Sequence, residues 1–249
     1  MNRFPIHRFD VLPSTNLTAK EYADNGAPSL TVITANHQSN GRGRMEREFT
    51  SPLGGLYMSI ILRPDFDDSI MPLVTLAAGL ACTSVIEKFY DLTISLKWPN
   101  DLYVGARKLA GILTETGSYS YTLRKIPYVV VGIGINVNSR PQDFNSSLNG
   151  IVTSLVSESG KEYPPSSFIA PIVESLEHYC RYLKEEKKCF LGLWRQKDYL
   201  YGKKIYWDKP DSDIVYGIGM GIDSTGCYLI RDLQDQILPV LGGRLQVME

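Results

Sequence analysis

Apolar residues along the first 200 positions fall into two kinds of stretch. Short apolar or β-branched runs bounded by turn residues predict strands, over residues 4–9, 30–36, 56–62, 94–97, 109–115 and 128–137. Longer stretches with a helical repeat predict helices, over residues 15–25, 72–90 and 168–186. Strands and helices are thus interspersed along this part of the chain.

Residues at the ends of these stretches support the helices. Ser14 suits the N-cap of the first helix and Gly26 its end, and Pro72 suits the first position of the second. The second helix is apolar on nearly all sides and should be central, whereas the third carries one apolar stripe and should lie at the surface. We interpret the charged run 185–188 as the solvated end of the third helix. Residues 37–54 show no periodicity and predict a long loop, which at this length is usually functional or mobile.

The pattern changes after Trp194. Short predicted strands separated by glycine, aspartate and serine turns follow one another, over residues 203–207, 214–220, 227–230, 237–240 and 245–247. These strands predict a small all-β barrel, and we divide the chain into domains 1–200 and 201–249. A barrel of under ~60 residues has a marginal core, so we expect it to pack against the first domain.

Composition and charge exclude several classes of protein. The 26 basic and 27 acidic residues give a net charge of -1, so no global positive field can hold nucleic acid. The N-terminus lacks a signal-peptide core, and the apolar stretch 71–90 is interrupted by polar residues, which favours a buried helix over a membrane span. We therefore predict a cytoplasmic protein with no membrane or nucleic-acid partner. The four cysteines and three histidines are scattered, so neither a disulfide framework nor a zinc site is expected.

Residues 38–47 (QSNGRGRMER) alternate glycines with arginines. Exposed backbone N–H groups beside guanidinium groups suit a phosphate. A basic patch that contacts nucleic acid and a merely solvated loop are the alternatives. This stretch alone does not decide between them.

Residues 97–101 (KWPND) and 107–113 (RKLAGIL) form a second candidate site. Pro99 ends a strand and presents Asn100 and Asp101 at its tip, where a carboxylate could hold Mg²⁺ among nucleotide oxygens. Gly111 would allow a ligand to approach the backbone closely. The alternative is a charged hairpin, because Asn-Asp is a common turn pair.

Residues 128–138 place Gly132, Gly134 and Asn136 on one face of a strand, because side chains alternate. A face without side chains that ends in an amide could hold a purine. Neither a dinucleotide fingerprint nor a P-loop is present. At a predicted helix start, residues 13–16 (PSTN) offer small polar groups, which a simple N-cap would also explain.

Taken in order, these stretches resemble the biotin–protein ligase family. The similarity rests on residues 14–16, Gln38 with 41–44, 97–101, 107–111, 132–136 and 153–155, and on the short C-terminal β domain. The resemblance implies an α+β fold, with a catalytic domain built on a mixed sheet with helices and related to class II aminoacyl-tRNA synthetases, followed by an SH3-like barrel. It implies that ATP and biotin form biotinyl-5'-adenylate, and that biotin then passes to the acceptor lysine of a biotin carboxyl carrier domain.

The resemblance also implies roles for individual residues. The biotin site would comprise Ser14, Thr15, Asn16, Gln38, Gly41, Arg42, Gly43, Arg44, Lys108 and Gly111. The ATP site would comprise Arg44, Arg47, Phe49, Lys97, Asn100, Gly132, Gly134 and Asn136. Lys108, Arg44 and Lys97 would be catalytic, with Lys108 bridging the biotin carboxylate and the α-phosphate, and Asp101 would hold Mg²⁺. Fixed cations of this kind offset the repulsion between two anions as charge builds in transfer.

Three positions depart from the family pattern. The family often has glycine at Glu46, commonly has tryptophan at Phe49, and usually has glutamate at Arg244. These departures put in question loop closure, the area for stacking on adenine, and the barrel's contacts to ATP or carrier. The Ser-Thr-Asn motif begins at residue 14, so we expect no N-terminal helix-turn-helix and no DNA-binding function. A weak homodimer is left open.

Two alternatives compete with this interpretation. A lipoate or octanoyl ligase of the same fold should show a different arginine- and glycine-rich signature and a pocket loop that carries histidine. A non-catalytic biotin sensor could lose Lys108 or the arginines, and this chain has both. The residues therefore favour a biotin ligase.

Overall fold

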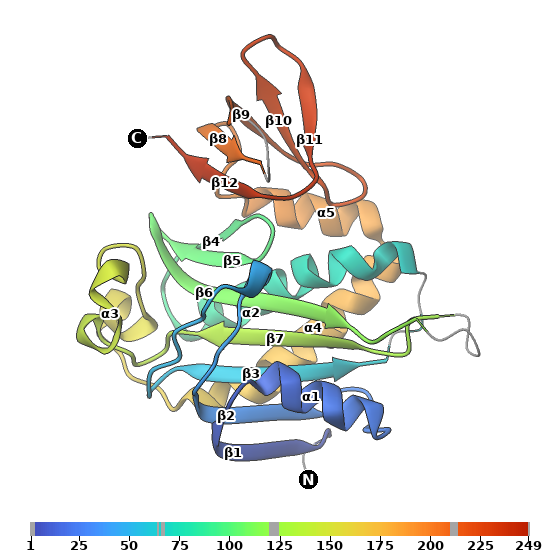
Figure 1. Ribbon diagram of the computed structural model, residues 1–249, viewed down its shortest axis with the longest axis vertical. Helices are drawn as coiled ribbons and strands as arrows, with labels where there is room; N and C mark the ends of the chain where they lie inside the picture. Colours follow the sequence, from blue (N-terminus) through green and yellow to red (C-terminus); the bar gives the residue numbers. More distant parts are fainter. Residues whose placement is uncertain (1–2, 64, 66–67, 120–124, 210–213, 249) are drawn as a thin grey trace.

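The computed structural model describes residues 3–63, 65, 68–119, 125–209 and 214–248, and shows two packed units (Figure 1). The larger unit contains a seven-stranded sheet with helices on both faces, and the smaller contains a five-stranded sheet near the C-terminus. The predicted α+β architecture with a small β unit is confirmed.

The seven strands have the order β1-β2-β3-β7-β6-β5-β4. Their bounds are β1 Ile6–Leu12, β2 Val32–Gln38, β3 Leu56–Leu62, β4 Ile94–Lys97, β5 Asp101–Val104, β6 Arg107–Thr116 and β7 Val129–Ile135. β1 pairs with β2 in parallel and the other neighbours are antiparallel, so the sheet is mixed. Every residue of β3 and β7 is buried, as expected of strands covered on both faces.

Helices cover the two faces of this sheet unequally (Figure 1). On one face lies α1 (Thr15–Asp24), which packs Ala19 and Ala23 against Tyr128 and Val130 of the sheet. On the other face α2 (Val74–Phe89) and α4 (Ile169–Glu185) bury the main core. Shorter helices are α3 (Leu155–Ser159), α5 (Lys187–Gln196), η1 (Arg44–Glu46), η2 (Asp68–Leu73), η3 (Pro141–Asp143), η4 (Ser146–Leu148) and η5 (Pro165–Phe168).

The face under α1 is only half covered by that helix. Because side chains alternate along a strand, Gly132 and Gly134 continue the face on which Val130 packs against α1. The glycines leave a flat strip of sheet beyond the helix N-terminus. This strip is the feature that positions the site.

The C-terminal unit is antiparallel with the order β11-β10-β9-β8-β12. Its strands are β8 Lys204–Asp208, β9 Val215–Ile222, β10 Tyr228–Asp232, β11 Ile237–Val240 and β12 Arg244–Val247. Trp98 Nε1 donates to Gly226 O at 3.0 Å, and Arg195 donates to Ile222 O at 2.6 Å. One continuous hydrophobic core spans both units. The expectation that the barrel packs against the first domain is confirmed, and the boundary at residue 200 remains a prediction.

Three local expectations were incomplete or wrong. β5 was not predicted, because Asn100 and Asp101 were interpreted as the tip of a turn, and the strand begins at Asp101. The run 185–188 is not simply a solvated end, since α5 begins at Lys187 and buries Phe190, Leu191 and Trp194. α3 was also missed.

The ends of two predicted helices also differ from expectation. Pro72 lies in η2, two residues before α2 begins. Ser14 occupies the N-cap of α1, but its side chain makes no capping hydrogen bond.

Residues Ile70–Phe89 form the one described helical stretch that is long and apolar enough to cross a membrane. Most of this stretch is buried inside the protein, where α2 packs against β4, β6 and α4. Its apolar character is therefore that of a core helix.

Asp198 lies between α5 and the C-terminal unit. Its Oδ1 accepts the Leu200 N–H at 2.9 Å, and the buried carboxyl faces the Tyr228 hydroxyl. Burial raises the pKa of this carboxyl from 3.8 to about 6. The folded protein therefore bears a cost for ionising Asp198 at neutral pH.

Asp198→Asn should stabilise the protein at alkaline pH. The pKa of Asp198 is higher in the folded protein than in the unfolded chain. With respect to Asp198, the wild-type protein is therefore fully stable below about pH 4, where Asp198 is protonated in the folded state, and it loses stability as the pH rises through about 6. The asparagine retains the acceptor for Leu200 and cannot ionise. Urea unfolding should show a gain on the order of 2 kcal/mol at pH 8 that nearly vanishes at pH 4. Equal gains at both pH values, or the same gain for exposed Asp91→Asn, would contradict this account.

The loop after β2 contains unusual backbone at Met45 and Glu46. Both residues have φ of 56°, in the left-handed region, which costs an L-residue roughly 1–2 kcal/mol. Glu46 is also the position at which the sequence departs from the expected glycine. Because glycine adopts this conformation without penalty, the departure places strain in the loop.

Glu46→Gly should therefore stabilise the protein by up to about 1 kcal/mol, after the entropy cost of a glycine in the unfolded chain is subtracted. Glu48→Gly is the matched control, because Glu48 lies two residues away and is not among the positive-φ residues. The control should lose stability, and unfolding free energies measure both. Equal losses for the two variants would show that Glu46 is not strained.

Candidate functional site

A cavity of about 500 Å³ opens over the flat strip of the sheet. It lies between the N-terminus of α1, the loop after β2, the ends of β4 to β7 and the C-terminal unit. Nearly every residue that the sequence predicted for the site lines it, namely Ser14, Thr15, Asn16, Gln38, Arg42, Gly43, Arg44, Arg47, Phe49, Lys97, Asn100, Asp101, Lys108, Gly111, Gly132 and Gly134. Gly41 and Asn136 lie outside the lining.

Glycines form the floor of this cavity. Gly111 of β6 and Gly134 of β7 are direct cross-strand partners, and the Phe49 ring lies over both. A Cβ on Gly134 would come 2.5 Å from that ring, and a Cβ on Gly132 would collide with Asn16 Oδ1. Tyr57 meets Phe49 edge-on with ring centroids 6.4 Å apart. The predicted slot therefore exists, and in this structure an aromatic side chain of the protein occupies it.

Gln38 connects α1 to the loop that carries Phe49. Its Oε1 accepts the Thr15 N–H at 2.8 Å, and its Nε2 donates to Ser51 Oγ at 2.9 Å. Ser51 Oγ donates in turn to Phe49 O at 3.0 Å. Gly41 also belongs to this junction, because its carbonyl accepts the Phe49 N–H. Gly41 thus shapes the loop and does not face the cavity.

A buried polar network fixes the amide of Asn16. Ser59 Oγ donates to Asn16 Oδ1 at 2.6 Å, and Asn16 Nδ2 donates to Glu115 Oε2 at 2.8 Å. Lys20 pairs with Glu115 Oε1 at 2.8 Å. Burial alone would raise the pKa of Glu115, but the hydrogen bonds from Lys20 and Asn16 outweigh it and the pKa is lowered. Glu115 is therefore a carboxylate at neutral pH.

Sequence reasoning missed Ser59, Glu115 and Lys20. Ser59 is the one small polar residue in the otherwise apolar and aromatic strand β3, and it is fully buried. A buried polar group needs a partner, so its presence in an apolar strand was the available signal. Glu115 gave a weaker signal as a charge near the end of a buried strand.

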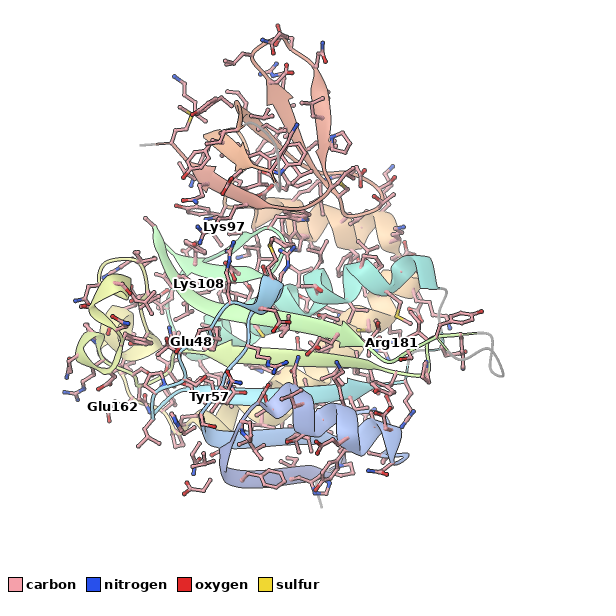
Figure 2. The ribbon with its side chains drawn as sticks, in the orientation of Figure 1. Glu48, Tyr57, Lys97, Lys108, Glu162 and Arg181 are labelled. Carbon is pink, nitrogen blue, oxygen red and sulfur yellow. The ribbon has the colours of Figure 1, made fainter. Side chains whose placement is uncertain are left out.

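Cations gather at the end of the cavity next to the C-terminal unit. Lys97 of β4 and Lys108 of β6 both lie at this end of the sheet (Figure 2). Lys108 Nζ pairs with Asp101 Oδ1 at 2.7 Å, and Lys97 Nζ donates to Tyr103 Oη at 3.3 Å. Arg44 NH1 lies 3.5 Å from Asn100 Oδ1.

Positive charge exceeds negative charge in this cluster. Burial lowers the pKa of Lys97, opposed by Asp101, and burial likewise lowers the pKa of Arg44. Three cations thus surround the single carboxylate of Asp101. Such a surplus in a partly desolvated cleft attracts anions.

Residues 148–153 form one wall and hold the backbone of Lys108. Lys108 N donates to Ile151 O and Thr153 N donates to Lys108 O, both at 2.8 Å. Asn136 Nδ2 donates to Thr153 O at 2.9 Å, and its Oδ1 is buried with no hydrogen-bond partner among the described residues. Asn136 therefore braces this wall, and one acceptor of its amide is unused.

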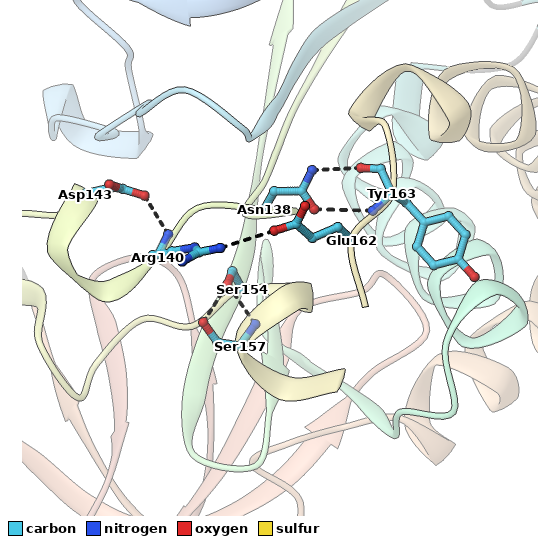
Figure 3. Close-up of polar contacts among 7 residues, drawn as sticks. All are labelled: Asn138, Arg140, Asp143, Ser154, Ser157, Glu162 and Tyr163. Carbon is cyan, nitrogen blue, oxygen red and sulfur yellow. Dashed lines mark hydrogen bonds and ion pairs between the residues drawn. The ribbon is translucent and has the colours of Figure 1, made fainter. Parts of the chain in front are cut away.

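The segment that carries this wall leaves the sheet after β7, and a second polar network holds it in place (Figure 3). The Asn138 side chain bonds both the N–H and the carbonyl of Tyr163, at 3.3 and 2.8 Å. Arg140 contacts Asp143 and Glu162, and Ser154 caps α3 through Ser157. These contacts fix both ends of the segment that bears the wall.

Acidic groups capable of holding a metal are few. Within the described residues no group of three or more histidine, cysteine, aspartate or glutamate side chains converges. Asp101 has a carboxylate in the cavity that faces a cation, and in this structure that cation is the ammonium group of Lys108. A divalent ion here would draw its other ligands from water and from a substrate, which is how Mg²⁺ usually binds.

Known proteins resemble this chain along nearly its whole length. A "Bifunctional ligase/repressor BirA" of Bacillus subtilis (strain 168) is 37% identical over 224 residues, which are 89% of this chain and 68% of that protein. A "Biotin--[acetyl-CoA-carboxylase] ligase" of Paracoccus denitrificans is 28% identical over 229 residues, covering 88% of this chain and 90% of that protein.

A solved structure supports the same relationship. The biotin protein ligase of Aquifex aeolicus in complex with biotin and ATP has a TM-score of 0.83 and 26% identity, covering 98% of each chain. The model of the "Biotin/lipoate A/B protein ligase family" matches residues 8–136, which carry the glycine floor, the arginine loop and Lys108. The chain therefore belongs to the biotin/lipoate A/B protein ligase family.

Proposed function

We propose that this protein is an ATP-dependent biotin–protein ligase, which forms biotinyl-5'-adenylate and transfers biotin to the acceptor lysine of a biotin carboxyl carrier domain. The observation that carries the proposal is one cavity in which a flat glycine floor runs into a cluster of cations around Lys108. An apolar ring system and the phosphates of a nucleotide would be held end to end in such a cavity.

Biotin would lie along the glycine floor. Its fused rings and aliphatic chain would pack on Gly111 and its neighbours, in the space that the Phe49 ring fills. The polar groups at the start of α1 would meet the ureido ring, and Ser14 Oγ is available because it caps no helix. The proposed biotin residues are Ser14, Thr15, Asn16, Gln38, Gly41, Arg42, Gly43, Arg44, Lys108 and Gly111, with Gly41 acting through the shape of the loop.

ATP would occupy the cationic end. The proposed residues are Arg44, Arg47, Phe49, Lys97, Asn100, Gly132, Gly134 and Asn136. Once biotin displaces the Phe49 ring from the floor, that ring would be free to stack on adenine. Asn136 lies outside the cavity lining, so its buried Oδ1 would have to be uncovered by a shift of the wall at 151–153 before it could accept from the adenine amino group.

Adenylation joins two anions, the biotin carboxylate and a phosphate of ATP, and the cations of the site would offset their repulsion. A carboxylate oxygen of biotin attacks the α-phosphorus, the bond between the α-phosphorus and its bridging oxygen breaks, and pyrophosphate leaves. Lys108, Arg44 and Lys97 would stabilise the charge that builds on the phosphoryl oxygens. In the second step the amine of the carrier lysine attacks the carbonyl carbon of the mixed anhydride, and AMP leaves.

Asp101 is the proposed residue for Mg²⁺. Bound there, Mg²⁺ would neutralise phosphate charge. Asp101 meanwhile orients Lys108 through their 2.7 Å contact. We further propose a cytoplasmic location and a carboxylase carrier domain as protein partner, without nucleic-acid binding, and a weak homodimer remains open.

Lys108→Ala should fold normally and lose biotin-dependent ATP–pyrophosphate exchange by about 10²–10³-fold, because one preorganised charge donor to the transition state is removed. Lys204→Ala, an exposed lysine of the C-terminal unit, is the control. The loss of such a donor should leave far less than about a third of wild-type exchange. Retention of more than that would remove Lys108 from this role. Exchange that requires lipoate in place of biotin would overturn the proposed substrate.

Gly134 belongs to the proposed ATP residues, but it also lies beside Gly111 in the floor beneath Phe49. Gly134→Ala should therefore weaken biotin binding by about tenfold or more, because overpacking costs typically 1–3 kcal/mol and the new methyl would fill the floor. Calorimetric titration with biotin measures the effect. Gly192→Ala in α5 is the control, since a Cβ there meets nothing within 4 Å. Unchanged biotin affinity in a folded Gly134→Ala variant would show that the ligand does not lie on this strip.

A further inference from the structure

Arg244 brings a cation into the cavity from the C-terminal unit. It is the first residue of β12, an edge strand, and residues 243–246 line the same cavity as Lys97 and Lys108. The family usually has glutamate at this position, and that departure put the barrel's contacts to ATP or carrier in question. The structure instead places a guanidinium at the open side of the cationic end.

The positive charge of Arg244 is close enough to change the pKa of residues opposite it in the cavity. Burial lowers the pKa of Lys97, and the positive charges of Lys108 and Arg244 lower it further. Burial raises the pKa of Tyr103, and Arg244 opposes that rise. Within the described residues Arg244 makes no ion pair and no side-chain hydrogen bond, although the carboxylate of Asp208 is its cross-strand neighbour.

The start of β12 is anchored, so Arg244 does not depend on a loose tail. The neighbouring Leu245 is buried, and Arg244 pairs in register with Asp208 of β8. Trp207 Nε1 donates to Gly242 O at 2.6 Å and holds the turn before the strand. Like charges held near one another without a partner are unfavourable, and a polyanion between them relieves that repulsion.

We propose that Arg244 binds the β- and γ-phosphates of ATP, and then pyrophosphate, across the cavity from Lys97 and Lys108. This inference rests on the proposed function, in which Lys108 faces the α-phosphate at the end of the floor. The two outer phosphates then extend away from the sheet, toward the C-terminal unit. The polyphosphate site is thus shared between the two units.

The experiment compares Arg244→Glu, Arg244→Lys and the matched control Arg231→Glu, an exposed arginine of β10 outside the cavity. Adenylation without carrier is measured while ATP or biotin is varied. For Arg244→Glu the KM for ATP should rise about 5- to 10-fold, which is the scale of a charge-assisted contact that remains exposed. Inhibition by pyrophosphate should weaken to a similar extent, whereas inhibition by AMP and the KM for biotin should stay unchanged.

The other two variants define specificity. Arg244→Lys should keep most of the affinity for ATP, and Arg231→Glu should match the wild type. If Arg244→Glu keeps the wild-type KM for ATP and the wild-type response to pyrophosphate, the inference is wrong. An effect confined to the KM for the carrier would also overturn it and would place Arg244 at a protein interface.

Direct calorimetric titration with inorganic pyrophosphate separates this inference from the proposed function. A wild-type chain that binds pyrophosphate through Arg244 but does not adenylate biotin would support the anion site and overturn the proposed activity. A wild-type chain that adenylates biotin, with equal pyrophosphate affinity in Arg244→Glu, would leave the activity standing and overturn the anion site.

Discussion

The close approach of α1 and the arginine loop to strand β7 is the constraint on which the site depends. Side chains at positions 132 and 134 would collide with Asn16 and Phe49. Because both positions are glycine, the helix N-terminus and the loop can settle against bare backbone. The body of α1 packs on Tyr128 and Val130, while Asn16 in its first turn lies over Gly132. The close packing of α1 and the loop on β7 and the shape of the cavity therefore both result from the glycines at these two positions.

The cationic end is assembled from segments that are distant in sequence. β4, β6 and the loop after β2 contribute Lys97, Lys108 and Arg44, while the wall at 151–153 fixes the backbone of Lys108. The C-terminal unit closes the remaining side, and its position is set by Trp98 and by a shared core. A change at the junction between the units would therefore alter the charge around the substrate without touching any residue of the sheet.

Strands and helices with strong periodicity were predictable from sequence, and so was the membership of the cavity. The bounds of β3 and β11 agree residue for residue, because uniform apolar runs end at clear turn signals. β5 and α5 were not found, because one begins inside a predicted turn and the other begins inside a charged run. Tertiary partners such as Ser59 with Asn16 were also beyond sequence patterns, since hydrogen bonds between distant segments leave no periodic trace. Asn136 was placed on the correct strand end, but its amide serves the wall.

The position of the Phe49 ring has a consequence for selectivity. The floor between Gly111 and Gly134 is covered by a side chain of the protein, and this shields an apolar strip of backbone from water. Any molecule that settles there must first replace the contacts of that ring. A small apolar compound would gain little from the exchange, because it would offer the floor no more than the phenyl group does. A molecule that also contacts the polar groups of α1 and the cations beyond the floor would gain binding free energy from the floor, from α1 and from the cations. The Phe49 ring therefore competes with ligands for the floor, and only ligands that make these additional contacts bind well.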